Sequence, residues 1–314
     1  MKRRVVITGM GALTPVGLTA AETWRNIRAG VCGIAPITSL DVTEHKVKLA
    51  GEVKGLDVEA FIPKKDAHRM CRFTQLALIA SLEAFGQAGL DMSREDPSRC
   101  GVIVSSGVGG LDFIEHEHDH GLEKGFDRVS PFFIPMVITN MAAGTIAIRH
   151  GFRGMCSSVV TACAGGTNAL GDAFRQIRDG YADVMLCGGT ESCITPLGLG
   201  GFTSMRALCE SNDPARASIP FDRQRSGFVM GEGAGILCLE EYEHAAARGA
   251  AILGEVAGYG ATCDAHHMTA PAEDGAGAAA CMVQAIADAG IAPADIGYIN
   301  AHGTSTPLND KCET

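Results

Sequence analysis

The stretch "SSVVTACAGGTNALGDAFRQIRDG" at residues 157–180 joins a β-branched run, a glycine pair and an amphipathic segment. The β-branched run predicts a buried strand at 158–161, and apolar side chains from 170 to 177 recur at the spacing of a helix. A further short apolar run predicts another strand at 183–187. Strands that alternate with helices in this way are typical of a layered α/β fold.

Cys163 lies on the predicted turn between this strand and this helix. Gly165 and Gly166 allow the backbone to turn tightly and to approach a ligand closely. A thiol at a helix N-terminus lies beside unpaired backbone N–H groups and the positive end of the helix dipole, which favour thiolate over thiol. Most cysteines are small buried hydrophobic residues, but this context predicts that Cys163 is a nucleophile.

Two segments about two hundred residues apart follow the same plan of helix, glycine, short connection, strand and glycine loop. The first is "LALIASLEAFGQAGL" at 76–90 followed by "CGVIVSSGVGG" at 100–110, and the second is "AAACMVQAIADAG" at 278–290 followed by "IGYINAHGTST" at 296–306. Any two helix–strand units resemble each other to some extent. The match nevertheless favours a duplicated α/β half-fold.

His302 follows the second predicted strand, at a position equivalent to Ser106 in the first segment. Polar residues that follow strand ends in α/β proteins commonly belong to binding sites. A lone histidine is more often a surface or core residue. Together, Cys163 and His302 predict a thiol–imidazole pair, although the sequence does not place them side by side.

Composition excludes several classes of function. The 314 residues are 46% hydrophobic and include 40 glycines, and the net charge of −10 gives no electrostatic footprint for nucleic acid. Twelve scattered cysteines without a C-x-x-C pair predict a reduced, cytoplasmic protein. No apolar run is long enough for a transmembrane helix, and the start "MKRRVVITGMGALTPVG" is better interpreted as a first strand that enters a glycine turn than as a signal peptide.

Two other motifs are weaker. "GMGAL" at 9–13 lacks the third glycine of a dinucleotide-binding loop. "EHEHDH" at 115–120 has histidine at every second position and could gather a metal on one face of a strand, but the flanking acids favour a solvated loop. We therefore expect no metal site.

Longer motifs resemble one family. The segments are "TACAGG" at 161–166, "SPFFIP" at 130–135, "TPLGLGGF" at 195–202, "FDRQRSGFVMGEGAGILCLEEYEHAAARGA" at 221–250 and "NAHGTSTPLND" at 300–310. Together they resemble the β-ketoacyl-acyl carrier protein synthases, especially the type II elongating enzymes of bacterial fatty acid synthesis. The resemblance implies the thiolase fold, in which two duplicated halves form five α-β-α-β-α layers, usually in a homodimer.

The resemblance also implies a chemistry. Cys163 would accept an acyl chain from the phosphopantetheine of acyl carrier protein, and a malonyl thioester would lose carbon dioxide and attack the acyl-cysteine. His302 would donate a hydrogen bond to the malonyl thioester oxygen, and Thr304 and Thr306 would position the pantetheine arm. No cofactor is expected beyond the phosphopantetheine that arrives on the carrier.

Further residues are assigned by the same resemblance. Val108 would lie beside the far end of the acyl pocket, where valine leaves room for a long chain. Phe133 and Phe202 match other pocket positions, although either could equally be ordinary core. Lys65, Arg69 and Arg206 would bind the acidic carrier protein, and "PKKDAHRMCR" at 63–72 is the densest basic run. A solvated basic face is the alternative.

One departure concerns the second half. The family has a second histidine in a Lys-Ser-x-x-Gly-His motif and a later loop rich in glycine and phenylalanine, whereas this sequence stops at "NDKCET". We expect a C-terminally truncated chain, with a first thiolase-like half at 1–250 and the beginning of the second at 251–314. The alternatives to a condensing enzyme of fatty acid synthesis are a polyketide ketosynthase and a non-catalytic partner subunit of the chain-length-factor type. Such a partner subunit would lack the nucleophile.

Overall fold

The computed structural model describes residues 2–314, and these form two compact units. Unit 1 consists of the residues up to Gly33 together with Gly51–Gly198 and Gly231–Glu255, and unit 2 consists of Ile34–Ala50, Leu199–Met230 and Val256–Thr314. Helix α8 (Pro196–Ser204) runs across one of the boundaries. We describe the two units separately.

Unit 1 is built on a six-stranded mixed sheet. Strands β4, β5 and β6 are parallel, and β7 is antiparallel to both β6 and β1. The strand order is β5 (Cys156–Ser157), β4 (Cys100–Ser105), β6 (Val184–Glu191), β7 (Gly233–Glu241), β1 (Val5–Leu13) and β8 (Gly254–Val256).

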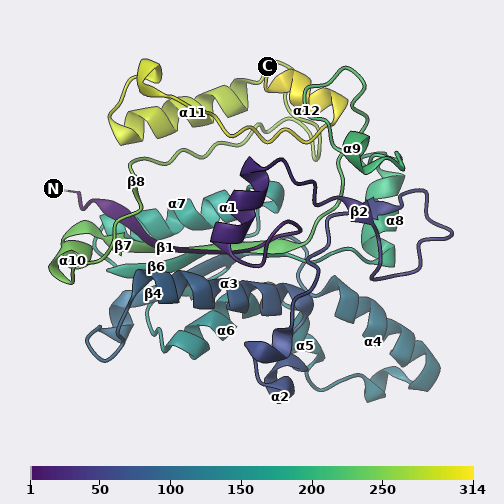
Figure 1. The fold of residues 1–314 in the computed structure, drawn as a ribbon, viewed down its shortest axis with the longest axis horizontal. Helices are drawn as coiled ribbons and strands as arrows, with labels where there is room; N and C mark the ends of the chain where they lie inside the picture. Colours follow the sequence, from purple (N-terminus) through teal and green to yellow (C-terminus); the bar gives the residue numbers. More distant parts are fainter. Residues whose placement is uncertain (1) are drawn as a thin grey trace. The chain divides into compact units, whose positions relative to one another are not determined.

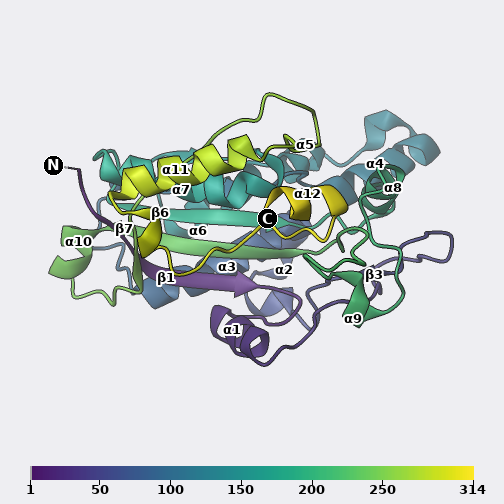
Figure 2. The ribbon, with the colours of Figure 1, turned by 90° about the horizontal axis from the view of Figure 1, so that it is seen from above.

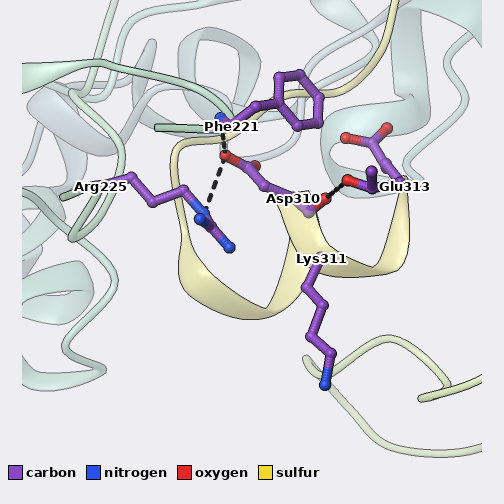
Figure 3. Close-up of a pocket in the computed structure, with 6 residues that line it drawn as sticks. Phe221, Arg225, Asp310, Lys311 and Glu313 are labelled. Atoms are coloured by element: carbon purple, nitrogen blue, oxygen red, sulfur yellow. Dashed lines mark hydrogen bonds and ion pairs between the residues drawn. The ribbon is translucent and has the colours of Figure 1, made fainter. Parts of the chain in front are cut away.

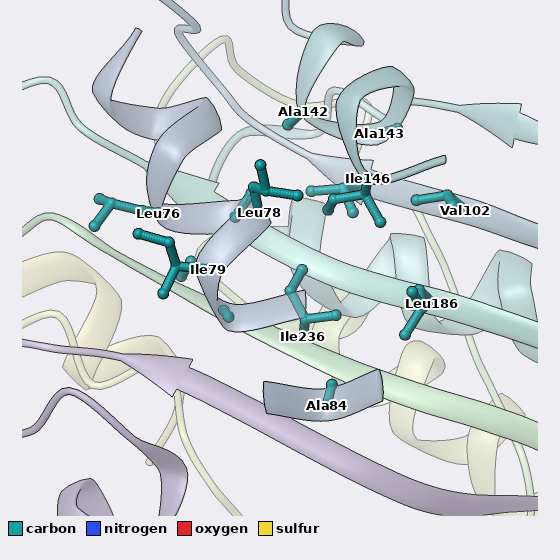
Figure 4. Packing of buried hydrophobic residues seen from close by; sticks show 14 of the residues in the cluster. Leu76, Leu78, Ile79, Ala84, Val102, Ala142, Ala143, Ile146, Leu186 and Ile236 are labelled. Atoms are coloured by element: carbon teal, nitrogen blue, oxygen red, sulfur yellow. The ribbon is translucent and has the colours of Figure 1, made fainter. Parts of the chain in front are cut away.

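Helices cover both faces of this sheet. Helices α3 (Arg72–Ala88) and α6 (Met141–His150) pack on one face and α7 (Gly165–Arg178) on the other (Figures 1 and 2). Side chains of α3, α6 and the strands interdigitate in the main core, where Leu76, Ile146 and Ile236 are fully buried (Figure 4). The other helices of unit 1 are α1 (Ala20–Arg28), α2 (Lys64–Ala67), α4 (Leu111–Lys124), α5 (Phe133–Val137) and α10 (Tyr242–Ala247).

Close packing explains the glycines of the first strand. A Cβ added to Gly9 would lie 2.0 Å from the Ala84 carbonyl oxygen, and one added to Gly11 would lie 2.0 Å from that of Ala80. Strand β1 therefore continues through both glycines, with an irregularity in its pairing with β7 between Ile7 and Gly9, and α3 lies directly against it. The expected first strand is confirmed, and the turn that follows it lies at Thr14–Gly17, where Thr14 and Gly17 exchange backbone hydrogen bonds. Gly9 and Gly11 lie within the strand and allow helix–strand contact.

Unit 2 contains less regular structure. Its elements are the two-stranded sheet β2 (Ala35–Pro36) and β3 (Leu49–Ala50) with helices α9 (Pro214–Ala217), α11 (Ala276–Ala289) and α12 (Pro307–Cys312). Leu49, Cys209 and Ala217 form a small buried cluster. No helix among residues 2–314 is both long and apolar enough to cross a bilayer.

The repeated segments match in part. Both α3 and α11 end at a left-handed glycine, Gly89 or Gly290, and a 3₁₀ turn follows each of them, at Pro97–Arg99 and Pro293–Asp295. The expected strand at 296–300 is wrong, because within the described residues no strand pairs with this segment and its Tyr298 is 80% exposed.

Two other local predictions also need correction. The strand expected at 158–161 is instead the short β5 at Cys156–Ser157, which pairs only with β4 in the described sheet, and the chain then leaves the sheet. The "EHEHDH" segment is neither strand nor loop but part of helix α4, so alternate positions do not share a face. The mixed α/β class itself is confirmed, and unit 1 has the α-β-α layering of one thiolase-type half.

Candidate active site

The Cys163 turn, which we define as residues Thr161–Ala164, leads directly into α7. Residues Ala162–Ala164 form a 3₁₀ turn, and the Cys163 residue is exposed. Ala162 has a φ of 49°, in the left-handed region that non-glycine residues seldom adopt. The Thr161 hydroxyl donates a hydrogen bond of 3.0 Å to Asn168 Oδ1 in the first turns of the helix. The backbone therefore bends sharply at the predicted nucleophile.

Two close contacts place this turn at the carboxyl ends of parallel strands. A Cβ on Gly165 would lie 1.9 Å from Ser105 Oγ, at the end of β4. A Cβ on Gly189, near the end of β6, would lie 3.2 Å from the Cα of Gly166. Because β4 and β6 run in parallel, both strands deliver their last residues to the start of α7. Sites in α/β proteins are commonly built at such strand ends.

The buried thiols of unit 1 are less reactive. Burial raises the pKa of the Cys71, Cys100, Cys193 and Cys238 thiols to about 12, and it also raises the pKa of Cys187. These groups stay protonated at neutral pH and are poor nucleophiles. The exposed Cys163 differs from them in being accessible to reagents.

The loop after β4 passes beside the Cys163 turn. Glu191, the last residue of β6, accepts hydrogen bonds from the Ser106 hydroxyl and from the backbone N–H groups of Gly107 and Val108. A Cβ on Gly107 would lie 3.9 Å from the Cα of Ala162. Val108 is 37% exposed, so this predicted pocket residue is accessible in the described structure.

In unit 2, the predicted histidine lies on a tightly folded loop. The backbone N–H groups of His302 and Gly303 donate to the two carboxylate oxygens of Glu313, at 2.7 and 2.8 Å. The hydroxyls of Thr304 and Thr306 are 2.8 Å apart. These contacts connect the two predicted pantetheine-binding threonines and give the His302 backbone a fixed anchor.

Asp310 is a second anchor for the same loop. Asp310 is buried, and its carboxylate accepts hydrogen bonds from the backbone N–H groups of Phe221 and Ser305. Arg225 lies 3.3 Å from the same carboxylate and also donates to the Thr306 and Pro307 carbonyls. Figure 3 shows the Phe221 amide and Arg225 converging on Asp310 at a cavity of about 530 Å³.

The two predicted catalytic residues belong to different units. Cys163 lies in unit 1 and His302 in unit 2, so their pairing stays a prediction.

The predicted pocket phenylalanines lie in aromatic contacts. Phe133, at the start of α5, is half-buried and packs against Phe113 with ring centroids 6.3 Å apart. Phe202, in α8, meets Phe228 edge to face at 5.3 Å. These contacts suit both a pocket wall and ordinary core, and the pocket role of Phe133 and Phe202 stays a prediction.

The three predicted docking residues are all exposed. Lys65 lies in α2, and the Arg69 guanidinium stacks over the Phe132 ring at 4.6 Å. Arg206, in unit 2, follows α8 with a left-handed φ of 55°. Arg69 also lines a cavity of about 460 Å³ together with Phe61, Met70 and Arg149.

Several residues of the site were not predicted from the sequence. Glu191, Ser105 and Arg225 act through contacts with residues distant along the chain. One signal was present for Glu191, since it is an acidic residue at the end of an apolar strand. The left-handed conformation of Ala162 had no signal, because alanine does not favour it.

Comparison with known proteins agrees with this geometry. Residues 2–245 match the family model "Beta-ketoacyl synthase, N-terminal domain", and residues 253–314 match "Beta-ketoacyl synthase, C-terminal domain". The chain is 51% identical to 3-oxoacyl-[acyl-carrier-protein] synthase 2 of Synechocystis, with all of this chain and 76% of that protein covered. It is 49% identical to the protein of the same name from Vibrio cholerae, over 99% of this chain and 76% of that protein.

Solved structures give the same result. A β-ketoacyl synthase from Burkholderia phymatum superposes with a TM-score of 0.91 at 35% identity, over all of this chain and 76% of that one. A type II polyketide ketosynthase, solved in complex with its acyl-carrier protein and bound to the hexaketide, superposes with a TM-score of 0.90 at 34% identity, with the same coverage. The described strand-end cysteine and the matches over both domains lead to one conclusion: this chain belongs to the β-ketoacyl synthase family and has its thiolase-type α/β fold.

Proposed function

We propose that this chain is an elongating condensing enzyme of fatty acid synthesis. The thiolate of Cys163 attacks the carbonyl of an acyl thioester carried by acyl carrier protein, and the phosphopantetheine thiol leaves. Malonyl-acyl carrier protein then loses carbon dioxide, and the resulting enolate carbon attacks the acyl-cysteine carbonyl. The carbon–sulfur bond to Cys163 breaks, and a β-ketoacyl thioester two carbons longer is released.

One observation carries the proposal: an exposed cysteine lies at a strained turn over the ends of two parallel strands. The 3₁₀ turn that contains Cys163 and the first turn of α7 present backbone N–H groups there, including that of Cys163 itself, to an acyl oxygen that becomes negatively charged during attack. His302 is proposed to donate to the enolate oxygen. The phosphopantetheine is part of the substrate, so the scheme uses no resident cofactor.

Acyl transfer to Cys163 is the step that tests this proposal. The protein is incubated with acyl-acyl carrier protein, and its intact mass is measured. We expect a mass increase of one acyl group in the parent and none in Cys163→Ser. Cys263→Ser, which removes another exposed thiol, is the matched control and should load normally. Loading of Cys163→Ser at the parent rate would refute the proposal.

Carrier docking is proposed to use Lys65, Arg69 and Arg206. These cations are exposed on a chain of net charge −10, so local positive charge, rather than the net charge, would attract the acidic carrier. Reversing the charge of Lys65 and Arg69 should raise the KM for carrier-bound substrate and leave free pantetheine thioesters unaffected. Equal losses on both substrates would contradict a docking role.

A polyketide ketosynthase is the second candidate, favoured by the fold match to the hexaketide-bound enzyme. The higher identity to the 3-oxoacyl synthases makes the fatty acid role the first choice. Loading assays with saturated acyl and poly-β-ketoacyl carriers distinguish the two. We further propose that the protein is a cytoplasmic homodimer. Sedimentation equilibrium would measure the oligomeric state.

A further inference from the structure

The carboxylate of Glu191 organises a loop that it does not belong to. We call Ser106–Gly109 the valine loop. The Ser106 hydroxyl donates to Glu191 Oε1 at 3.0 Å, and the N–H groups of Gly107 and Val108 donate to Oε2 at 2.8 and 3.2 Å. Ser106 Oγ in turn accepts from the Gly109 N–H at 3.0 Å. Glu191 and Ser106 thus bind every backbone N–H from Gly107 to Gly109.

The valine loop lies directly against the Cys163 turn. A Cβ on Gly107 would be 3.0 Å from Glu191 Oε2 and 3.9 Å from the Cα of Ala162, so the glycine lies close to both the carboxylate and the turn. Glu191 ends β6, and β6 also supports the start of α7 through Gly189 and Gly166. One strand end therefore holds both the nucleophile turn and the loop that carries Val108.

The strength of these contacts suits a positioning role. A carboxylate that accepts several N–H and O–H groups makes charge-assisted hydrogen bonds, which are stronger than those between neutral groups. Ser106 and Gly109 are buried at the two ends of the loop, whereas Gly107 is half-buried and Val108 is exposed, so the middle of the loop depends most on Glu191. Without Glu191, the place of the Val108 side chain relative to Cys163 would no longer be fixed.

We propose that Glu191 is a positioning residue that sets acyl-chain selectivity by holding Val108 at a fixed place beside the Cys163 turn. This inference rests on the proposed function, because it takes the acyl thioester as the ligand of the site. Glu191 touches neither substrate nor the reacting sulfur in this scheme and acts only through the valine loop.

The test compares rate constants for loading of Cys163 with acyl carriers of increasing chain length. Glu191→Ala removes both acceptor oxygens, so the ratio between the best and the poorest chain length should move toward one by at least about fivefold. Glu191→Gln keeps one carbonyl oxygen for the Gly107 and Val108 N–H groups, and we expect it to restore most of the parent ratio. Ser106→Ala should shift the ratio in the same direction as Glu191→Ala.

Glu83 provides the matched control. Its carboxylate also accepts backbone N–H groups, those of Ala12 and Ala20 at 3.0 and 2.9 Å, but it lies on α3 and does not bind the valine loop. Glu83→Ala should lower stability without changing the chain-length ratio. If it changes the ratio as much as Glu191→Ala does, the proposal is wrong, because general loosening would then explain both.

A second series keeps the inference separate from the proposed function. Alkylation of Cys163 by iodoacetamides with N-alkyl chains of increasing length needs neither carrier nor catalysis. A parent that fails to load acyl carriers but shows chain-length discrimination in alkylation would refute the proposed function only. Parent-like ratios for Glu191→Ala and Ser106→Ala in both series would overturn the role of Glu191. Should Glu191→Ala not fold, Ser106→Ala decides.

Discussion

The Cys163 turn depends on the absence of a β-carbon at Gly165. Its added Cβ would lie 1.9 Å from Ser105 Oγ, so Gly165→Ala forces the start of α7 away from β4. We expect a loss of about 1–3 kcal/mol of unfolding free energy and slower alkylation of Cys163. Urea denaturation and iodoacetamide kinetics measure the two effects.

Gly86 is the matched control for that substitution. It is an exposed glycine within α3, and nothing lies within 4 Å of its added Cβ. Gly86→Ala should therefore stabilise the protein by about 0.5–1 kcal/mol, because alanine loses less backbone entropy in a helix. A Gly165→Ala variant as stable as Gly86→Ala would contradict the close packing at the turn.

At this scale the sequence predicts only what neighbouring residues determine. The glycines after Cys163 indicated a tight turn because they adjoin it. Glu191 binds Ser106 from 85 positions away, and Asp310 binds Phe221 from 89 positions away. Such partners depend on the strand order, and no local pattern encodes that order.

Between α3 and α6, His150 creates an acid sensitivity. Burial, reinforced by Arg149, lowers the pKa of His150 to about 4, and the ring stacks on Phe85 with centroids 4.4 Å apart. The unfolded chain therefore binds this proton more tightly than the folded one. Stability should fall by roughly 3 kcal/mol as pH decreases from about 6.5 to 4.

A variant isolates this contribution. His150→Phe keeps an aromatic ring beside Phe85 and removes the titrating group, so its unfolding free energy should vary less with pH between about 6.5 and 4. Urea denaturation across this range measures the slope. If the parent and the variant have the same slope, burial of the imidazole is not the source of the acid sensitivity.

The cluster around α10 has the opposite pH dependence. Burial lowers the pKa of His244, but hydrogen bonds to Glu240 and Glu95 outweigh it and leave the pKa raised. For Glu240, burial raises the pKa. Hydrogen bonds from Arg248 and His244 lower it by more than burial raises it, so the pKa of this carboxyl lies below its ordinary value. His244 therefore stabilises the fold fully below its unfolded pKa of about 6.5, and this contribution is lost as pH rises through the folded pKa.

His244→Gln should remove that loss. We expect the parent to become less stable as pH rises above about 6.5, while the variant shows a flatter profile there. His68→Gln, a substitution at an exposed histidine, serves as the control and should follow the parent. Thermal denaturation between pH 6 and 9 is a suitable measurement, and parallel curves for all three proteins would exclude the cluster as the cause.

Elements were predicted best where apolar spacing and packing agree. The helix from 170 to 177 lies within α7, and its Ala173, Phe174 and Ile177 are buried. The runs at 158–161 and 296–300 have strand-like composition but lack neighbouring strands in the described structure, and neither is a strand there. Strand propensity depends on pairing, which composition alone does not supply.

For the molecule as a whole, sequence resemblance predicted the fold because long motifs occur in the family order along the chain. It did not predict how regular structure divides between the units. Unit 1 has a complete sheet with helices on both faces, whereas α11 in unit 2 contains no fully buried residue. Equivalent positions in a repeat therefore differ in how much apolar surface they bury.

This difference in burial predicts that α3 and α11, which occupy equivalent positions in the two repeated segments, differ in local stability. Helix α3 has a buried face from Phe73 to Ala88, while α11 exposes Met282 and Val283. Amides of α3 should exchange only through global unfolding, and those of α11 at least about 100-fold faster through local opening. Hydrogen exchange in low urea separates the two routes, because only global unfolding accelerates steeply with denaturant. Equal protection and equal urea dependence in both helices would mean that α11 is stabilised by contacts outside its own unit.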